Sequence, residues 1–268
     1  WVGKTMNKLK AVTFSYDDGV EQDKRLIQLL DRYGLKCTFN LNSGFLGKKG
    51  NLQRNIFGTT NWVSHNKIPV DEIKQVYRNH EVASHTVNHP TLRDLTDDKI
   101  VAEVLEDVAA LEKITGKKVC GLAYPNGYGP ADPVVFKKLT GQEYVPSEGD
   151  KLFLKNEHRV SDLIRKNTEL YYGRTTKSTY SFDLQENLLE FNPTVAHRET
   201  EERMDLAKRF VELEADKPQI YYIWGHSYEF DVSEKAWEDF ERLCEFIAGH
   251  DDVFYGTNDE VFRYFGLV

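Results

Sequence analysis

The sequence predicts a single α/β domain in which a parallel sheet is covered by helices. Runs of strand type, rich in β-branched and aromatic residues, alternate with amphipathic runs of helix type. The chain has 268 residues, 40% of them hydrophobic, which is enough for one large core, and about 250 residues is a usual size for a single α/β barrel. No linker-like or low-complexity segment divides the chain, so we expect residues 1–268 to form one domain.

The chain opens with a strand, a helix and a second strand. Residues 10–15 (KAVTFS) have the β-branched and aromatic composition of a strand. Residues 21–33 carry apolar side chains at helical spacing, and Gly34 follows as a helix stop. Residues 36–42 (KCTFNLN) alternate as a strand does. Residues 43–68 are rich in Gly and Asn, so we expect a long irregular loop there, and long loops are often functional.

The middle of the chain repeats this alternation. Residues 81–84 are expected to form a short strand that ends at His85. Thr96 is the expected N-cap of a helix whose apolar residues recur at helical spacing until Gly116. Residues 119–124 then predict another strand.

The last third of the chain predicts three more strands and two helices. Residues 170–174 and 219–224 are strand-like, and residues 200–214 between them have helical spacing. Ser233 is expected to cap a last helix, and residues 253–256 predict a final short strand. Polar clusters follow several of these strands directly, at the edge where parallel α/β folds build their active sites.

Composition excludes several classes of protein. The net charge is -8 and the basic residues are scattered, which disfavours a nucleic-acid partner. No apolar run approaches the roughly 20 residues that span a bilayer. Cys37, Cys120 and Cys244 form no CxxC pair, so we expect buried free thiols. Met6 is interpreted as the natural first residue, after residues 1–5, which favours a cytoplasmic protein, although a secreted enzyme that has lost its signal would look the same.

Two polar clusters suggest a metal site. Asp17 and Asp18 end the first strand, and adjacent residues on an extended segment point to opposite sides. One carboxylate could therefore bind a cation while the other acts as a base; the alternative is an acidic pair at a helix N-terminus. His85 and His89 are four residues apart, as on one face of a helical turn, although capping or surface histidines would show the same spacing. Asp18 with the two histidines gives three ligands of mixed type, which leaves a position for water. Such ligands suit Zn, Co, Ni, Mn or Fe.

Two further segments could serve catalysis. Residues 123–129 (AYPNGYG) predict a turn with exposed backbone N–H groups that could hold an oxyanion, or an ordinary turn. Residues 222–227 (YIWGHS) place His226 at the end of an apolar strand, with Trp224 two residues earlier on the same side. His226 could be a general acid beside an apolar acyl pocket, or a structural histidine next to core aromatics.

Together these segments resemble the polysaccharide deacetylase family, also called the NodB homology domain or carbohydrate esterase family 4. The resemblance runs from about residue 10 to residue 265. Four segments carry it: residues 11–19 (AVTFSYDDG) are similar to its TFDDG strand end, residues 85–90 (HTVNHP) match H-[ST]-x-x-H-P, residues 123–127 (AYPNG) resemble R-x-P-x-G, and residues 224–226 (WGH) resemble the stretch that closes on a catalytic histidine.

The resemblance implies a distorted (β/α) barrel with about seven parallel strands. It also implies a metal-dependent deacetylase that removes acetyl groups from N-acetylated oligo- or polysaccharides. The cofactor implied is one divalent transition metal, Zn first and Co, Ni, Mn or Fe as alternatives, held by Asp18, His85 and His89.

The resemblance further implies a role for each of the other site residues. Asp17 would be the general base that takes a proton from the attacking water, and His226 would protonate the leaving amine. The backbone N–H of Asn126 would help to hold the oxyanion. Tyr124 and Trp224 are expected to take part in oxyanion or substrate binding.

The sequence departs from the family pattern in several places, as expected of a divergent branch. Residues 36–42 (KCTFNLN) resemble the family's KATFF strand, with Asn40 in place of an expected apolar residue. Ala123 stands where the third motif begins with an arginine that orients the base, and no clear copy of the fourth motif is present. The strand at residues 170–176 offers Arg174 instead. We hypothesise that Arg174 reaches Asp17 in place of the missing arginine; the alternative is a surface or interdomain ion pair.

Other polar and aromatic residues have weaker assignments. Tyr228 and Glu229 are candidates to contact sugar hydroxyls, and Trp62, Trp224 and Tyr128 are candidates to stack on sugar rings. Competing functions are an esterase or small-amide hydrolase on the same scaffold and a non-catalytic carbohydrate-binding protein. The remaining histidines are expected to be solvated or structural, with His197 a candidate for the substrate cleft: His65, His80, His158, His197 and His250.

Overall fold

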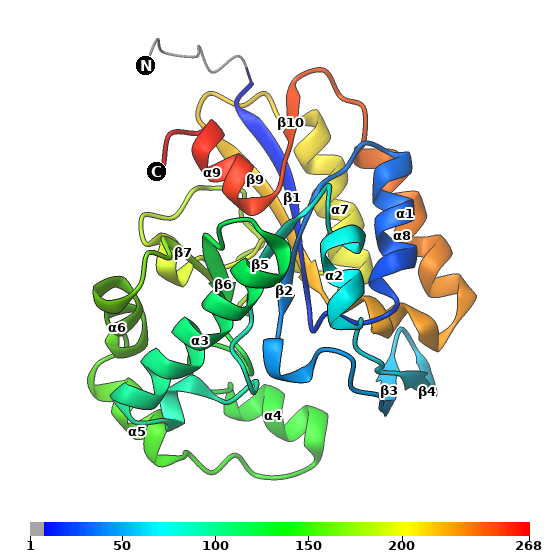
Figure 1. Ribbon diagram of the computed structural model, residues 1–268. Helices are drawn as coiled ribbons and strands as arrows, with labels where there is room; N and C mark the ends of the chain where they lie inside the picture. The colour runs from blue at the N-terminus through cyan, green and yellow to red at the C-terminus, as the bar shows by residue number, and fades with distance from the viewer. Residues whose placement is uncertain (1–7) are drawn as a thin grey trace.

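The computed structural model describes residues 8–268 (Figure 1). Met6, interpreted above as the first natural residue, lies outside the described residues. A parallel sheet runs through the middle of the molecule and is flanked by helices, as the sequence predicts. Within residues 8–268, no helix combines the length and apolar character needed to cross a bilayer.

The sheet has the strand order β7-β6-β5-β2-β1-β9-β8, and β10 also pairs with β1. All these pairings are parallel, and the sheet curls into a half-barrel, which confirms the distorted (β/α) barrel. Among the described residues β7 and β8 do not pair with each other, so the barrel stays open between them. The strands of this sheet are β1 (Lys10–Asp17), β2 (Cys37–Leu41), β5 (Glu81–Ser84), β6 (Gly121–Ala123), β7 (Tyr172–Arg174), β8 (Val195–Ala196), β9 (Gln219–Gly225) and β10 (Val253–Tyr255).

The predicted helices are present with slightly different ends. Gly116 ends the longest of them in the left-handed conformation (φ 72°), as a glycine cap does. Ser233 accepts a hydrogen bond from Ala236 N and caps α8. The helices are α1 (Asp23–Arg32), α2 (Val70–Val76), α3 (Asp97–Thr115), α4 (Pro133–Thr140), α5 (Glu148–Lys155), α6 (Arg159–Asn167), α7 (Thr200–Glu212), α8 (Glu234–Ile247) and α9 (Asn258–Tyr264).

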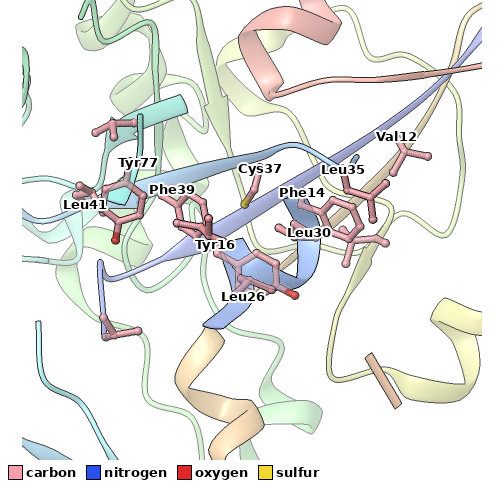
Figure 2. Close-up of a cluster of buried hydrophobic side chains, with 14 of the residues drawn as sticks. Val12, Phe14, Tyr16, Leu26, Leu30, Leu35, Cys37, Phe39, Leu41 and Tyr77 are labelled. Atoms are coloured by element: carbon pink, nitrogen blue, oxygen red, sulfur yellow. The ribbon is translucent and has the colours of Figure 1, made fainter. Parts of the chain in front are cut away.

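The two faces of β1 pack in different cores. Val12, Phe14 and Tyr16 point to one face, where they meet apolar side chains of α1 and β2 (Figure 2). Ala11 belongs to a second cluster that includes Phe262 of α9. Both faces are covered, so every residue of β1 is buried. This central strand is therefore a rigid support for the two aspartates at its end.

The expectation of an irregular segment at residues 43–68 is wrong in part. Residues in this range form an antiparallel hairpin, β3 (Asn51–Ile56) and β4 (Thr59–Ser64), with Gly58 (φ 72°) in its turn. Its outer residues are polar, apart from the exposed Trp62, which weakens the alternation by which strands are recognised. The helices α2, α4, α5, α6 and α9 were also not predicted.

Candidate active site

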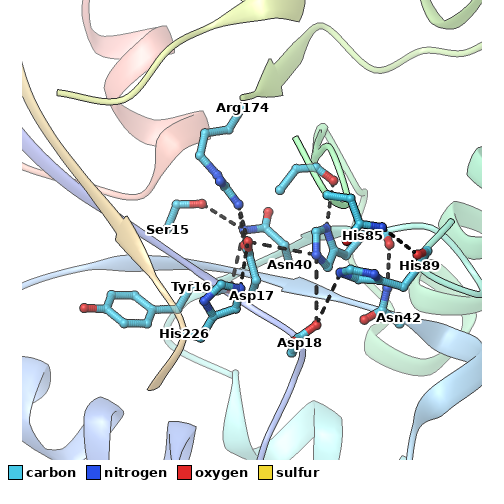
Figure 3. A network of polar contacts seen from close by, with 12 residues as sticks. Ser15, Tyr16, Asp17, Asp18, Asn40, Asn42, His85, His89, Arg174 and His226 are labelled. Carbon is cyan, nitrogen blue, oxygen red and sulfur yellow. Dashed lines mark hydrogen bonds and ion pairs between the residues drawn. The ribbon is translucent and has the colours of Figure 1, made fainter. Parts of the chain in front are cut away.

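Eight of the nine predicted site residues line one cleft at the carboxyl ends of the strands, and the ninth, Arg174, contacts Asp17 without lining the cleft. Figure 3 shows how Asp17, Asp18 and three histidines of this cleft face one another. The volume of the cleft is about 350 Å³, within the usual range of ligand pockets. The hairpin contributes one wall, which the sequence did not predict. The cleft is lined by Asp17, Asp18, Phe45, Leu52, Arg54, His65, Lys67, His85, His89, Tyr124, Asn126, Gly127, Thr176, Trp224, His226 and Tyr228.

Asp18, His85 and His89 fit a divalent cation. One ligand atom from each lies within 4.8 Å of the other two. Asp18 Oδ1 is 4.0 Å from His85 Nε2 and 3.8 Å from His89 Nε2. Two metal–ligand bonds of about 2.1 Å span at most about 4.2 Å, so the separations of Asp18 from each histidine fit donors that share one ion. The donor set, two imidazoles and a carboxylate, suits a transition metal.

The two aspartates face the same cleft because the chain turns at the end of β1. Asp18 (φ 85°) and Gly19 (φ 62°) both have left-handed backbone conformations. The sequence interpretation treated the aspartates as neighbours on an extended segment, which point to opposite sides. The left-handed turn instead brings the Asp18 carboxylate back beside that of Asp17.

The two histidines are not on a helical turn, which corrects the interpretation of their spacing. Residues 85–90 are irregular, and Thr86 (φ 64°) and His89 (φ 54°) have positive φ angles. Asn42 holds this loop by donating to the carbonyl oxygens of His85 (2.5 Å) and Thr86 (3.1 Å). Asp107 of α3 holds it from the other side by accepting from His85 N at 3.2 Å. The loop conformation therefore depends on residues far away in the sequence.

The backbone fixes which nitrogen of His85 is free. His85 Nδ1 lies 2.8 Å from the carbonyl oxygen of Ala123 and can only donate to it. This bond sets the neutral tautomer that leaves Nε2 unprotonated toward Asp18. Burial lowers the pKa of His85 to about 4, so the neutral ligand form is favoured at physiological pH.

Asp17 is held by Arg174 and Asn40. Arg174 Nη2 donates to both carboxylate oxygens, at 2.5 Å to Oδ1, and Asn40 Nδ2 donates to Oδ1 at 2.8 Å. The Arg174 guanidinium also stacks 4.4 Å from the ring centroid of Trp224. Burial raises the pKa of Asp17, but the Arg174 guanidinium and the neighbouring His85 and His226 outweigh it, so the pKa stays below its usual value. Asp17 is thus an ionised, buried carboxylate.

Two residues that the sequence interpretation left out contact Asp18. His65 Nε2 lies 3.2 Å from Asp18 Oδ2, and Lys67 Nζ lies 3.6 Å from Asp18 Oδ1. Both follow the hairpin, and Lys67 is buried. Burial raises the pKa of Asp18, but these partners hold it well below its usual value. His65 had been expected to be solvated or structural.

His226 lies between two carboxylates. Its Nε2 is 3.9 Å from Asp17 Oδ2, and its Nδ1 is 3.7 Å from Glu229 Oε1. Burial lowers the pKa of His226, but Glu229, Asp18 and Asp17 outweigh it and raise the pKa above its usual value. The imidazole is therefore suited to carry a proton in the cleft.

The remaining predicted residues differ in where they lie. Asn126 (φ 57°) lines the cleft, and within residues 8–268 its backbone N–H donates to no protein acceptor. Tyr124 also lines it, but its hydroxyl donates to Leu189 O at 2.6 Å. Trp62 and Tyr128 do not line this cleft, and Trp62 pairs with Gln53 on the outer face of the hairpin.

Sequence reasoning missed residues whose role depends on distant partners. Asn40 was noted as polar where the family has an apolar residue, and that departure was the available signal. Arg54 gave no such signal in the sequence. Its Nη2 donates to the Tyr228 hydroxyl at 2.6 Å, and this contact depends on the hairpin. His197 is fully buried and does not line the cleft. The buried cysteines match the expectation of free thiols.

Comparison with solved structures shows a shared fold. The chain is 13% identical to a protein of Mycobacterium smegmatis described as a polysaccharide deacetylase, with 98% of this chain and 92% of that chain covered and a TM-score of 0.61. It is 13% identical to a family 4 carbohydrate esterase from Streptomyces lividans in complex with acetate, with 93% and 92% covered and a TM-score of 0.50.

Some of the similar proteins are longer or lack activity. The chain is 16% identical to a mutant of the family 4 pseudoenzyme BA3943 with restored enzymatic activity, with 95% of this chain and 68% of that chain covered and a TM-score of 0.50. It spans 61% of the Streptococcus pyogenes deacetylase PplD. At these identities the likeness shows the fold alone.

The sequence itself matches one family. No curated protein matches the chain. The model of the polysaccharide deacetylase family matches residues 4–145, a range that holds the Asp-Asp-Gly turn, both histidines and Asn126 but neither Arg174 nor His226. Because this match covers more than half of the sequence, the chain belongs to the polysaccharide deacetylase family.

Proposed function

We propose that this protein is a metal-dependent hydrolase that removes acetyl groups from N-acetylated sugars. The observation that carries the proposal is the convergence of the Asp18, His85 and His89 donor atoms within 4.8 Å, in the cleft that also holds Asp17 and His226. Membership in the polysaccharide deacetylase family supports the choice of substrate.

The proposed reaction uses an ionised base, an oxyanion donor and a protonated acid. A divalent cation held by Asp18, His85 and His89 would supply Lewis-acid chemistry, by acidifying water and polarising the amide carbonyl. Asp17, whose pKa is held low by Arg174, would accept a proton from the attacking water. The Asn126 N–H would donate to the developing oxyanion.

His226 would complete the reaction by protonating the leaving amine nitrogen. Its raised pKa favours the protonated form that this step needs. The C–N bond breaks, and acetate and a free amino sugar are released. Trp224 would border the acetyl group, since its ring lines the cleft beside Arg174 and His226.

Acetate release from N-acetylchitooligosaccharides tests the proposal. We expect release that chelation abolishes and Zn, Co, Ni, Mn or Fe restores, with one equivalent of metal by elemental analysis. Asp17→Asn and His89→Ala should abolish release, whereas His250→Ala, at a half-buried histidine that does not line the cleft, should not. Release only from acetylated xylan would favour an esterase, and no release from any acetylated sugar would favour a non-catalytic binding protein.

A further inference from the structure

Glu229 is a buried carboxylate that lies between two imidazoles. Its Oε2 is 2.7 Å from His197 Nε2, and its Oε1 is 3.7 Å from His226 Nδ1. Only 4% of Glu229 is exposed, and His197 is fully buried. Glu229 does not line the cleft described above, so it lies away from the surface where sugar hydroxyls would bind.

The two nitrogens of His226 have different surroundings. Nε2 faces Asp17 and the cleft, at 3.9 Å from Oδ2, whereas Nδ1 faces Glu229. A carboxylate at Nδ1 fixes the tautomer and orientation of an imidazole that acts through Nε2. Glu229 thus lies on the side of the ring where an orienting group is effective and cannot obstruct substrate.

A chain of hydrogen bonds fixes Glu229 in turn. Burial raises the pKa of Tyr16 well above its usual value, so its hydroxyl keeps its proton and donates to His197 Nδ1 at 3.2 Å. His197 must then carry its proton on Nε2, where it donates to Glu229 Oε2. Burial lowers the pKa of His197 to about 4, consistent with this neutral form. Glu229 Oε1 is left free to face His226 Nδ1, at the 3.7 Å of an ion pair.

The backbone holds His197 in place for this contact. His197 N donates to Trp224 O at 2.7 Å, which continues the pairing of β8 with β9. Gly225 precedes His226, and a Cβ on it would lie 2.5 Å from His197 Cγ. Only a glycine at this position lets the His197 ring pack against the strand that carries His226.

We propose that Glu229 is the positioning residue for His226, holding Nδ1–H toward itself and Nε2–H toward the leaving nitrogen. His197 and Tyr16 support Glu229 from behind. Glu229 lies three residues after His226, in the segment that follows β9. The role in catalysis rests on the proposed function, whereas the pairing of Glu229 with His226 does not.

Several charged groups surround His226, and each could affect its titration. They come from the end of β1, the loop after β5, the end of β7, the segments that follow β8 and β9, and the hairpin with the residues after it. The groups are Asp17, Asp18, Arg54, His65, Lys67, His85, His89, Arg174, His197 and Glu229.

NMR titration of the histidine rings in metal-free protein tests the pairing without any activity. We expect Glu229→Gln to lower the pKa of His226 and to shift its neutral form away from the Nδ1–H tautomer, seen in the 15N shifts. Glu229→Asp should keep part of both effects. Glu190→Gln is the matched control, since Glu190 pairs with the exposed His158 (2.7 Å) and should change His158 only. An unchanged pKa and tautomer of His226 in Glu229→Gln would overturn the proposal.

Kinetics test the consequence for catalysis. Glu229→Gln should lower kcat on an N-acetylated sugar by up to about 10²-fold, the lower end of what general acid–base catalysis contributes, with little change in KM. Activity on 4-nitrophenyl acetate should be spared, because its leaving group needs no proton. Equal losses on both substrates would overturn the role in positioning. Wild-type protein inactive on every substrate would sink the proposed function and leave the NMR result standing.

Discussion

Arg174 contacts both carboxylate oxygens of Asp17, although 157 residues separate them in the sequence. Arg174 ends β7 and Asp17 ends β1, so the curl of the sheet brings the two strand ends together. Both side chains are buried, and the guanidinium has no solvent to compensate its charge. The pair therefore belongs to the cleft and is not the surface or interdomain ion pair considered as the alternative.

Arg174→Ala should impair both activity and stability. The buried Asp17 would lose its main partner, which typically costs about 3–5 kcal/mol of unfolding free energy. The pKa of Asp17 would rise, so the acidic limb of the kcat/KM profile should move to higher pH. We expect acetate release to fall by about 10²-fold or more.

Two variants control this experiment. Arg174→Lys keeps the charge but loses the contact with both oxygens, so its activity should be intermediate. Arg263→Ala removes an exposed arginine that pairs with Asp259 and should leave the profile unchanged. Undiminished turnover in Arg174→Ala would rule out a role for Arg174 in the reaction.

Asn40→Leu should raise the pKa of Asp17, as Arg174→Ala should, but by a smaller amount. The substitution restores the apolar residue of the family and removes the 2.8 Å hydrogen bond to Asp17 Oδ1. A hydrogen bond to a charged group contributes about 1.5–3 kcal/mol, so the acidic limb should rise by about 1–2 pH units. Asn55→Leu on the exposed side of β3 is the control. Identical pH profiles for the wild type and Asn40→Leu would show that this amide does not tune the base.

The sequence predicts what depends on local pattern and fails where distant segments meet. The strands and helix α3 were predictable because their apolar spacing and the Gly116 cap are local. The proximity of Asp18, His85 and His89 was predictable. The backbone that brings them together was not, because the loop at 85–90 is held by Asn42 and Asp107.

The contacts of Lys67 and Glu229 could not be predicted in this way. Lys67 reaches Asp18 only because the hairpin folds over the strand ends, and nothing in its local sequence marks it. Glu229 meets His197 because β8 pairs with β9, and a strand of two residues gives no periodic signal. Polar groups buried by tertiary contacts are thus the part of the site that needs a structure.

Metal removal should lower thermal stability as well as activity. A ligand that binds only the folded state stabilises it by about 2.7 kcal/mol when its free concentration is 100 times its Kd. We expect chelation to lower the Tm of the wild type, measured by scanning calorimetry, and added Zn to restore it. In His89→Ala neither treatment should change the Tm, because one of the three ligands is gone.

The His65→Ala variant tests, by the same Tm measurement, whether His65 is a metal ligand or only a neighbour of Asp18. His65 contacts Asp18 at 3.2 Å but does not belong to the group of three donors. Its removal should weaken metal affinity by about 10–100-fold, as for other residues that hold a ligand, and the Tm should still respond to Zn. If the Tm of His65→Ala no longer responded to Zn, His65 would itself be a metal ligand.

Because of Asp23, the free energy of unfolding should fall as the pH rises from about 4 to about 7. Its carboxyl is fully buried at the start of α1, and burial raises its pKa to about 7, although Ser227 (2.5 Å) and Tyr77 (2.7 Å) donate to it. The folded state thus keeps a proton that the unfolded chain releases above pH 3.8, so this group lowers the unfolding free energy by up to about 1.4 kcal/mol per pH unit until pH 7. In urea titrations of metal-free protein, Asp23→Asn should lack this slope and the exposed Asp71→Asn should retain it. Parallel stability curves for the wild type and Asp23→Asn would mean that Asp23 is ionised in the folded protein.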